Sequence, residues 1–259
     1  MAGSQISTAT PLMEVNGLTK QFGGLTAVSD VSFTLGHQEI LGLIGPNGAG
    51  KTTLYNLLVG LTRPTAGRVQ LDGKDITGQK PHRIAAAGLT KTFQNIALFA
   101  ESSVLDNVVT GALLRHGLQD ARDKAAAVLD RVGLAEAKDK PAGSLSFPER
   151  ARVELARGLA TEPRVLLLDE VMAALTPTEM DEMVGLIRDL KKDGLSIVVV
   201  EHHMQAVMRL CERILVLNFG ALIADGTPQQ IARDPVVIEA YLGSSAAHHQ
   251  EESGEGAHA

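Results

Sequence analysis

The sequence predicts an α/β fold on three observations. Three short apolar runs are typical of buried strands in a parallel sheet, and two of them end in charged or imidazole residues. Leucines at helical spacing follow the first run, in KTTLYNLLVGL. The middle of the chain, about residues 97–160, has apolar residues three and four apart, which is typical of helices. The three runs are EILGLIG (Glu39–Gly45), RVLLLDE (Arg164–Glu170) and LSIVVVEHH (Leu195–His203).

The composition predicts one folded domain between two polar segments. The chain has 259 residues, of which 44% are hydrophobic and 21% are charged, so it can bury a full core. We expect a flexible arm over residues 1–11 and a folded domain over residues 12–243. The last segment, 244–259, is small, polar, acidic and partly histidine, so we expect a disordered tail.

Charge and hydropathy exclude several classes of protein. The formal net charge is -6 and no basic patch is evident, which argues against a nucleic-acid partner. No apolar run approaches the roughly 18 to 20 residues that a membrane-spanning helix needs, so a membrane role would be peripheral. Cys211 is the only cysteine, which excludes an internal disulfide and fits a small buried apolar residue.

GPNGAGKTT follows the first strand and matches the phosphate-loop pattern. Gly45, Gly48 and Gly50 let the backbone turn tightly and point N–H groups at the phosphates of a nucleotide. We expect Lys51 to reach the outer phosphates, and the Thr52 hydroxyl to bind a Mg²⁺ ion that bridges the β- and γ-phosphates. The candidate nucleotide-binding residues here are Gly45, Pro46, Asn47, Gly48, Ala49, Gly50, Lys51, Thr52 and Thr53.

Acidic and imidazole side chains follow the other two strands. Asp169 is expected to hold Mg²⁺ through water, and Glu170 to orient or deprotonate the water that attacks the γ-phosphate. Either His202 or His203 could reach the γ-phosphate, and the residue pattern leaves this choice open. Because the carboxyl ends of parallel strands meet at one edge of a sheet, the pattern predicts a nucleotide hydrolase.

The segment GSLSFPERARVEL, Gly143 to Leu155, has two interpretations. Ser146 and Glu149 have capping-box spacing ahead of apolar positions, so the segment predicts the start of a helix. The same helix start could also contact a nucleotide, because its backbone N–H groups and dipole favour an anion. Local sequence does not choose between them.

From Leu12 to Gly243 the chain resembles the ATP-binding subunits of ABC transporters, on its phosphate loop, its carboxylate strand and its histidine strand. The resemblance implies a P-loop (RecA-like) core with an N-terminal antiparallel β subdomain and an inserted helical lobe at about 97–160. LSFPE lies where this family has its LSGGQ signature. By this resemblance Ser146 faces a nucleotide held by a second subunit.

The resemblance also assigns single residues, with ATP and Mg²⁺ as cofactors. Phe22 in KQFGG matches the aromatic residue that stacks on adenine, although core packing would explain it too. Gln94 in KTFQN matches the glutamine that joins the magnesium shell. Glu170 matches the catalytic glutamate, and His202 matches the switch histidine, which decides between the two histidines.

Within that family, several segments are similar to the ATPases of branched-chain amino-acid importers, including FGGLTAV, KTFQNIALF, EHHMQAVM and the ending ADGTPQQIARDPVVIEAYLG. This likeness implies transport of those or related solutes: amides, urea or aromatic acids. It also implies a second ATPase subunit, two membrane permeases, an indirect solute-binding partner, and a peripheral place on the cytoplasmic face of the bacterial plasma membrane. A regulatory scaffold with a degenerate signature and a soluble, non-transport ABC ATPase remain alternatives.

Three departures from the family pattern fall where a partner subunit's ATP would dock. The signature carries Phe147, Pro148 and Glu149 in place of glycines and glutamine. Val171 replaces a proline after the catalytic glutamate, and Thr176 replaces an aspartate in the next loop. We therefore expect an asymmetric pair, in which the complete phosphate loop here meets a more ordinary signature from a different ATPase.

Apolar residues follow Gln94 where an exposed loop should be polar. Leu98 and Phe99 either line a groove for a permease helix or pack within the helical lobe, and the sequence supports both interpretations equally.

Overall fold

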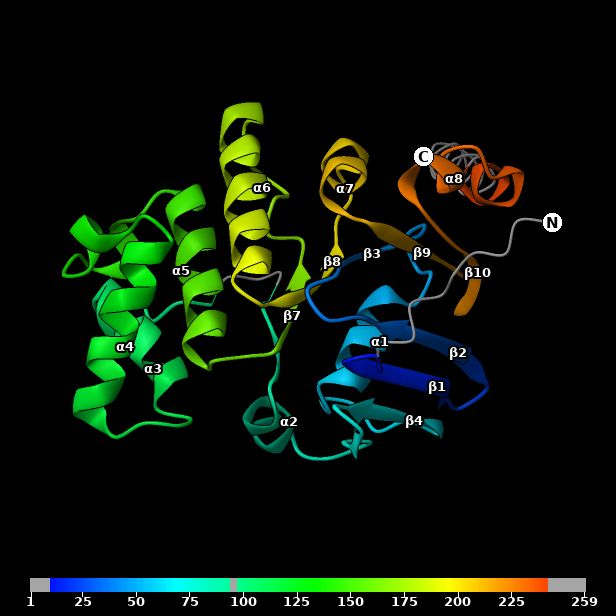
Figure 1. Ribbon diagram of the computed structural model, residues 1–259, viewed down its shortest axis with the longest axis horizontal. Coiled ribbons are helices and arrows are strands. Elements are labelled where there is room, and N and C mark those ends of the chain that lie inside the picture. The colour runs from blue at the N-terminus through cyan, green and yellow to red at the C-terminus, as the bar shows by residue number, and fades with distance from the viewer. Residues whose placement is uncertain (1–9, 94–96, 242–259) are drawn as a thin grey trace, which may run out of the picture.

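The protein is described here from a computed structural model, at residues 10–93 and 97–241. The expected arm over residues 1–11 and tail over 244–259 therefore lie almost wholly outside the described residues. Two β-sheets and the helices around them confirm the expected α/β class (Figure 1).

The N-terminal part is an antiparallel sheet in the order β2-β1-β4-β5. Its two long strands alternate buried and exposed residues, because one face packs on the core and the other faces solvent. The antiparallel subdomain that the family resemblance implies is thus present. The strands are β1 (Met13–Phe22), β2 (Leu25–Leu35), β4 (Ala66–Leu71) and β5 (Lys74–Asp75).

A six-stranded sheet in the order β10-β9-β3-β8-β7-β6 forms the centre. All its neighbouring strands run parallel except the β9–β10 hairpin. Every residue of β3, β7 and β8 is buried, which explains why the sequence shows them as continuous apolar runs. The strands are β3 (Ile40–Ile44), β6 (Leu89–Lys91), β7 (Val165–Asp169), β8 (Ser196–Val200), β9 (Arg213–Asn218) and β10 (Ala221–Gly226).

Successive residues of the central strands enter two different cores. Leu166 and Ile197 pack in the core that contains the helical lobe, whereas Leu167 and Val198 pack in the core shared with the antiparallel sheet. Cys211 is buried in the first core, as the sequence predicted for a small apolar residue. The helices on the central sheet are α1 (Lys51–Leu58), α2 (Pro81–Ala87), α6 (Pro177–Lys192), α7 (Met204–Leu210) and α8 (Pro228–Ile231).

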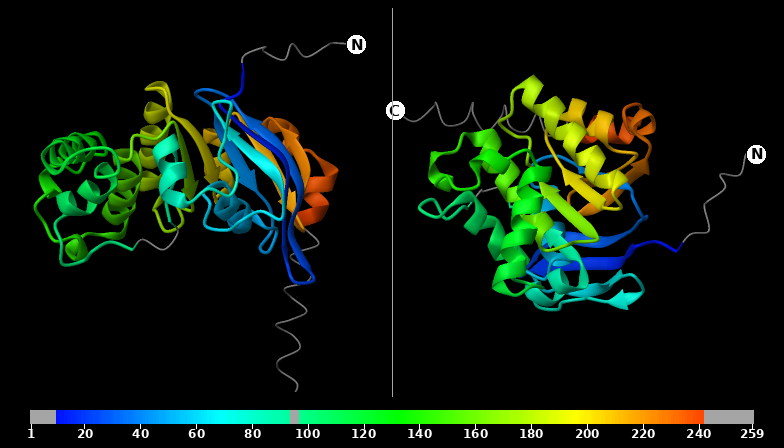
Figure 2. Two further views of the ribbon diagram at one scale, coloured as in Figure 1. Left: turned by 90° about the horizontal axis from the view of Figure 1, so that it is seen from below. Right: turned by 60° about the vertical axis from the view of Figure 1, so that its left-hand side comes forward.

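Three helices form a lobe at the end of the molecule away from the antiparallel sheet (Figures 1 and 2). They pack through small and apolar residues such as Ala112, Ala121, Ala125 and Leu129, all fully buried. The helical region predicted at about 97–160 is therefore helical, and the helices are α3 (Val104–Ala112), α4 (Leu118–Arg131) and α5 (Phe147–Ala160).

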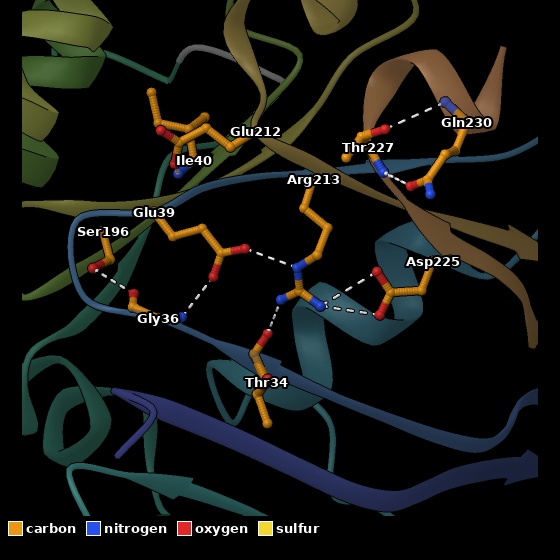
Figure 3. A network of polar contacts seen from close by, with 10 residues as sticks. All are labelled: Thr34, Gly36, Glu39, Ile40, Ser196, Glu212, Arg213, Asp225, Thr227 and Gln230. Carbon is orange, nitrogen blue, oxygen red and sulfur yellow. Dashed lines mark hydrogen bonds and ion pairs between the residues drawn. The ribbon is translucent and has the colours of Figure 1, made fainter. Parts of the chain in front are cut away.

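Arg213 connects several strands at the end of the central sheet where β3 and β9 begin (Figure 3). The Arg213 side chain donates to Glu39, Asp225 and the Thr34 carbonyl oxygen, so it joins β9 to β10, to β2 and to the start of β3.

Over residues 10–93 and 97–241, no helix combines the length and apolarity that a bilayer crossing demands.

Candidate nucleotide site

The phosphate loop connects β3 to α1, and two of its glycines are required by close backbone contacts. A Cβ atom on Gly45 would lie 2.1 Å from the Leu217 carbonyl oxygen, and one on Gly50 would lie 2.4 Å from the Ala27 carbonyl oxygen. Gly50 also has a φ of 100° where it precedes the first residue of α1. A side chain at either position would displace the loop, so the glycine spacing is a steric requirement of this turn.

Lys51 is held across its own loop. Its Nζ donates to the carbonyl oxygens of Gly45 at 2.7 Å and Pro46 at 3.0 Å, and the residue is only 8% exposed. Burial lowers the pKa of Lys51, while the charges of Glu170 and Asp169 act in the opposite direction. The ammonium group is thus fixed to the loop, and the charges of the two carboxylates favour its protonated form.

A cavity of about 520 Å³ opens over this loop. Of the residues predicted to bind nucleotide, Asn47 through Thr53 line it, together with Glu170 and His202. Gly45 and Pro46 do not line the cavity, and their carbonyl oxygens accept hydrogen bonds from Lys51 Nζ. The structure therefore brings together a glycine loop, a lysine and a hydroxyl, which suit a phosphate group, and it places a carboxylate and an imidazole beside them.

Glu170 and His202 are in direct contact. His202 Nε2 lies 2.7 Å from Glu170 Oε1, whereas His203 Nε2 lies 3.5 Å from the Ala173 carbonyl oxygen. Of the two histidines, His202 is the one that contacts Glu170 and lines the cavity. Glu170 has a φ of 55°, an uncommon left-handed conformation for a residue with a side chain.

Asp169 has a partner that the sequence did not reveal. Its carboxylate forms an ion pair with Lys91 at 2.9 Å, and both side chains are almost completely buried. The backbone N–H of Asp169 donates to the Thr92 hydroxyl. Asp169 does not line the cavity itself, but it is the last residue of β7 and directly precedes Glu170, which does.

The described residues fit a magnesium ion of the kind that nucleotide phosphates bring. They contain no group of three or more His, Cys, Asp or Glu side chains suited to hold a metal alone. Mg²⁺ at a nucleotide usually keeps several waters and takes only one or two protein ligands besides phosphate oxygens. Thr52, an exposed residue on the cavity wall, and Asp169, at the end of β7, supply a hydroxyl and a carboxylate oxygen, which is the number of protein ligands such an ion needs.

The predicted helix start at Ser146 is confirmed. Glu149 accepts from the Ser146 backbone N–H at 2.8 Å and its hydroxyl at 2.7 Å, which completes a capping box at the start of α5. These bonds lower the pKa of Glu149. Arg150 donates to the carbonyl oxygens of Leu145 and Gly143. Ser146 is not among the residues that line the cavity over the phosphate loop.

Two residues assigned by the family resemblance, Phe22 and Gln94, are not among the described residues that line the cavity. Phe22 is 50% exposed, with Lys20 Nζ 4.7 Å from its ring centroid, and it does not line the cavity. It pairs with Leu25, which does line the cavity, across the β1–β2 hairpin. Gln94, predicted as a magnesium and nucleotide ligand, lies outside the described residues.

The structure adds residues that the sequence did not single out. Phe219, at 88% exposure, and Gly220 join the cavity wall from the β9–β10 turn. Asn-Phe-Gly between two strands does signal a turn, but sequence alone does not show that this turn returns to the phosphate loop. Glu201, buried at the end of β8, accepts from the Met172 N–H just beyond Glu170.

The other departures from the family pattern have local explanations. Thr176 caps α6, because its hydroxyl accepts from the Glu179 N–H while Glu179 accepts from Thr176. Val171 is buried and packs in the core beside β7. Both substitutions therefore preserve the fold of the segment that follows Glu170.

Comparison with known proteins agrees with this geometry. Residues 28–173 match the family model described as ABC transporter, and residues 221–247 match the model of branched-chain amino acid ATP-binding cassette transporters. The chain is 40% identical to BraF of Pseudomonas aeruginosa and 41% identical to LivG of Escherichia coli, over 91% of this chain and 99% of each relative. Both relatives are high-affinity branched-chain amino acid transport ATP-binding proteins.

More distant relatives and solved structures extend the likeness. The chain is 36% identical to LptB of Haemophilus influenzae, a lipopolysaccharide export ATP-binding protein, over 90% of this chain and 97% of that one. The ADP conformation of MJ1267, an ATP-binding cassette of an ABC transporter, superposes with a TM-score of 0.84 at 28% identity, over 91% of this chain and all of that one. A nucleotide-free cassette gives a TM-score of 0.83 at 27% identity, over 90% and 99%.

Proposed function

This chain belongs to the ABC transporter family of ATP-binding subunits, and from that premise we propose that it hydrolyses ATP to drive an importer of branched-chain amino acids or related small solutes. The observation that carries this proposal is one cavity lined by the phosphate loop, Lys51, Glu170 and His202. The match of residues 221–247 to the branched-chain amino acid model favours such cargo over lipopolysaccharide, although a relative in lipopolysaccharide export is also similar. Amides, urea and aromatic acids remain within the solute class.

The chain's own groups suit each step of ATP hydrolysis. The backbone N–H groups of the loop and Lys51 would hold the β- and γ-phosphates, and Phe22 would stack on the adenine. Thr52, Asp169 and Gln94 would hold Mg²⁺, which neutralises charge on the phosphates as the terminal bond breaks. Glu170 would orient the attacking water, with His202 fixing the Glu170 carboxylate from 2.7 Å.

A second subunit would complete the site. Ser146 does not line this chain's own cavity, which fits a role for α5 at the ATP of a partner. In such a pair, Pro148 lacks an N–H that could bind phosphate, and the capping box holds the Glu149 carboxylate on Ser146. We propose an asymmetric pair with a related ATPase that supplies a more ordinary signature to this chain's loop.

Two permeases would receive the motion of this pair at the cytoplasmic face of the bacterial plasma membrane. Phe99 is 60% exposed, which fits a residue that lines a groove for a permease helix. Leu98 packs partly on the core, which fits packing within the helical lobe. An exposed aromatic side chain next to the helical lobe supports a docking groove for a permease helix. A solute-binding protein would deliver the solute on the other side of the membrane.

Purification of the chain from detergent-solubilised membranes tests the proposal. We expect two permeases and a distinct second ATPase to accompany it, and the complex in liposomes to import leucine at the expense of ATP. A chain that binds ATP but leaves import and hydrolysis unchanged after Glu170→Gln substitution would be a scaffold, which is the alternative that the altered signature supports.

A further inference from the structure

We propose that Glu201 is a positioning residue that fixes the catalytic Glu170 by accepting a hydrogen bond from the Met172 N–H. The inference depends on the proposed function, because it takes Glu170 as the group that orients water. Glu201 does not line the cavity, so it would act through the backbone that carries Glu170. Nothing in the sequence pattern or in the family resemblance had assigned it a role.

The conformation of Glu170 needs support from its surroundings. A φ of 55° in a residue with a side chain is a strained conformation that persists only where neighbouring contacts hold it. Two backbone N–H groups at and just after Glu170 donate hydrogen bonds to residues at the end of β8. The Glu170 N–H donates to the Val200 carbonyl oxygen at 2.9 Å, and the Met172 N–H donates to Glu201 Oε1 at 2.8 Å.

The acceptor of the second hydrogen bond is the carboxyl group of Glu201, which is buried. Glu201 is only 2% exposed, and within residues 10–93 and 97–241 its Oε2 has no hydrogen-bond partner. Burial raises the pKa of Glu201 to about 7, the Met172 N–H lowers it and the charge of Glu170 raises it further. Burial of a carboxyl group is energetically unfavourable. Here the buried carboxyl group of Glu201 accepts a hydrogen bond from the Met172 N–H.

The position of Glu201 in the chain connects this bond to catalysis. His202 follows Glu201 directly and contacts Glu170 Oε1 at 2.7 Å, so the end of β8 holds Glu170 both by its backbone and by its carboxylate. Loss of the Met172 bond would free the backbone two residues beyond Glu170. Displacement of a catalytic group by about 1 Å can reduce the rate by about a hundredfold.

Steady-state ATP hydrolysis by variants assembled in the purified transport complex tests the inference. For Glu201→Ala we expect kcat to fall at least about tenfold while the KM for ATP stays within about twofold, because the phosphate loop is untouched. Glu201→Leu fills the volume without an acceptor and should behave the same way if the alanine variant folds poorly. Glu201→Gln keeps an oxygen for the Met172 N–H and should retain at least about half of the parent kcat.

A matched control is Glu39→Ala. Glu39 also accepts a backbone N–H, from Gly36, and pairs with Arg213 at the far end of the sheet (Figure 3). Its loss should lower the melting temperature while kcat at a permissive temperature stays near the parent value. A fall in kcat of equal size in this control would overturn a specific role for Glu201.

A double substitution identifies the route of the effect. Because Glu201 is proposed to act through Glu170, adding Glu201→Leu to Glu170→Gln should change single-turnover hydrolysis less than twofold. A further tenfold loss in that background, or a leucine variant that hydrolyses ATP as fast as the parent, would overturn the proposal. A parent chain that hydrolyses no ATP even in its transport complex would instead contradict the proposed function.

Discussion

At the residue scale, the candidate site depends on charged side chains that the fold buries beside each other. Lys91 and Asp169 form an ion pair with 6% and 5% of their side chains exposed, and Asp169 directly precedes the cavity-lining Glu170. Removal of one member of such a pair leaves the other charge buried without a partner, which is usually far costlier than the net value of the pair. Lys91 should therefore be a strong determinant of stability.

Lys91→Met should lower the free energy of unfolding by about 3 to 5 kcal/mol, because Asp169 would remain buried without its counter-charge. Guanidinium chloride unfolding followed by circular dichroism measures the change. Lys124→Met is the control, because its ion pair with Glu162 is exposed and should contribute no more than about 1 kcal/mol. Equal, small changes in both variants would contradict the account of Lys91.

The buried Glu201 should make stability depend on pH. Its pKa is raised from 4.5 to about 7, so the folded protein keeps a proton that the unfolded chain releases above pH 4.5. The stabilising contribution is complete below pH 4.5 and is lost as the pH rises to about 7. Relative to the parent, Glu201→Gln should thus gain stability of the order of 3 kcal/mol across that window.

Urea unfolding of both proteins between pH 4.5 and 8 measures this difference. Parallel stability curves for the parent and Glu201→Gln over that range would show that the carboxyl group does not titrate as described.

At the element scale, the sequence was most informative where local rules determine structure. The buried strands β3, β7 and β8 and the capping box of α5 follow from apolar runs and from Ser-x-x-Glu spacing, and all are present. The cavity wall at Phe219 and the Lys91–Asp169 pair join segments far apart in the chain. Only the strand order determines these contacts, so residue patterns could not predict them.

The segment that begins at Ala97 should connect ATP hydrolysis to transport. Phe99→Asp should reduce import at least about tenfold while the chain still binds ATP, because a charge on the exposed ring position would disrupt an apolar groove. Leu98→Asp should do the same, although partial burial of Leu98 adds a stability cost. Leucine uptake and ATP hydrolysis in reconstituted liposomes are the measurements.

Leu118→Asp is the control for that prediction. Leu118 is 61% exposed at the start of α4, so a charge there should leave import intact. Full import by Phe99→Asp would exclude the groove.

At the scale of the whole molecule, the altered signature predicts unequal subunits. The isolated chain should hydrolyse ATP slowly, since two copies would place Pro148 and Glu149 against each other's ATP. Replacing Phe147, Pro148 and Glu149 together by Gly, Gly and Gln should increase hydrolysis by the chain alone about tenfold or more, because it restores the backbone N–H that Pro148 lacks and removes a carboxylate. Fast, cooperative hydrolysis by the unaltered chain alone would contradict the asymmetric pair.

Each part of this account requires that the cavity over the phosphate loop holds a triphosphate, and equilibrium titration with a fluorescent ATP analogue measures this most directly. Lys51→Ala should raise the dissociation constant at least about tenfold, since a charged hydrogen-bond donor to phosphate contributes about 1.5 to 3 kcal/mol. Lys124→Ala, on the helical lobe, should bind like the parent. Unchanged affinity in Lys51→Ala would contradict the assignment of this site.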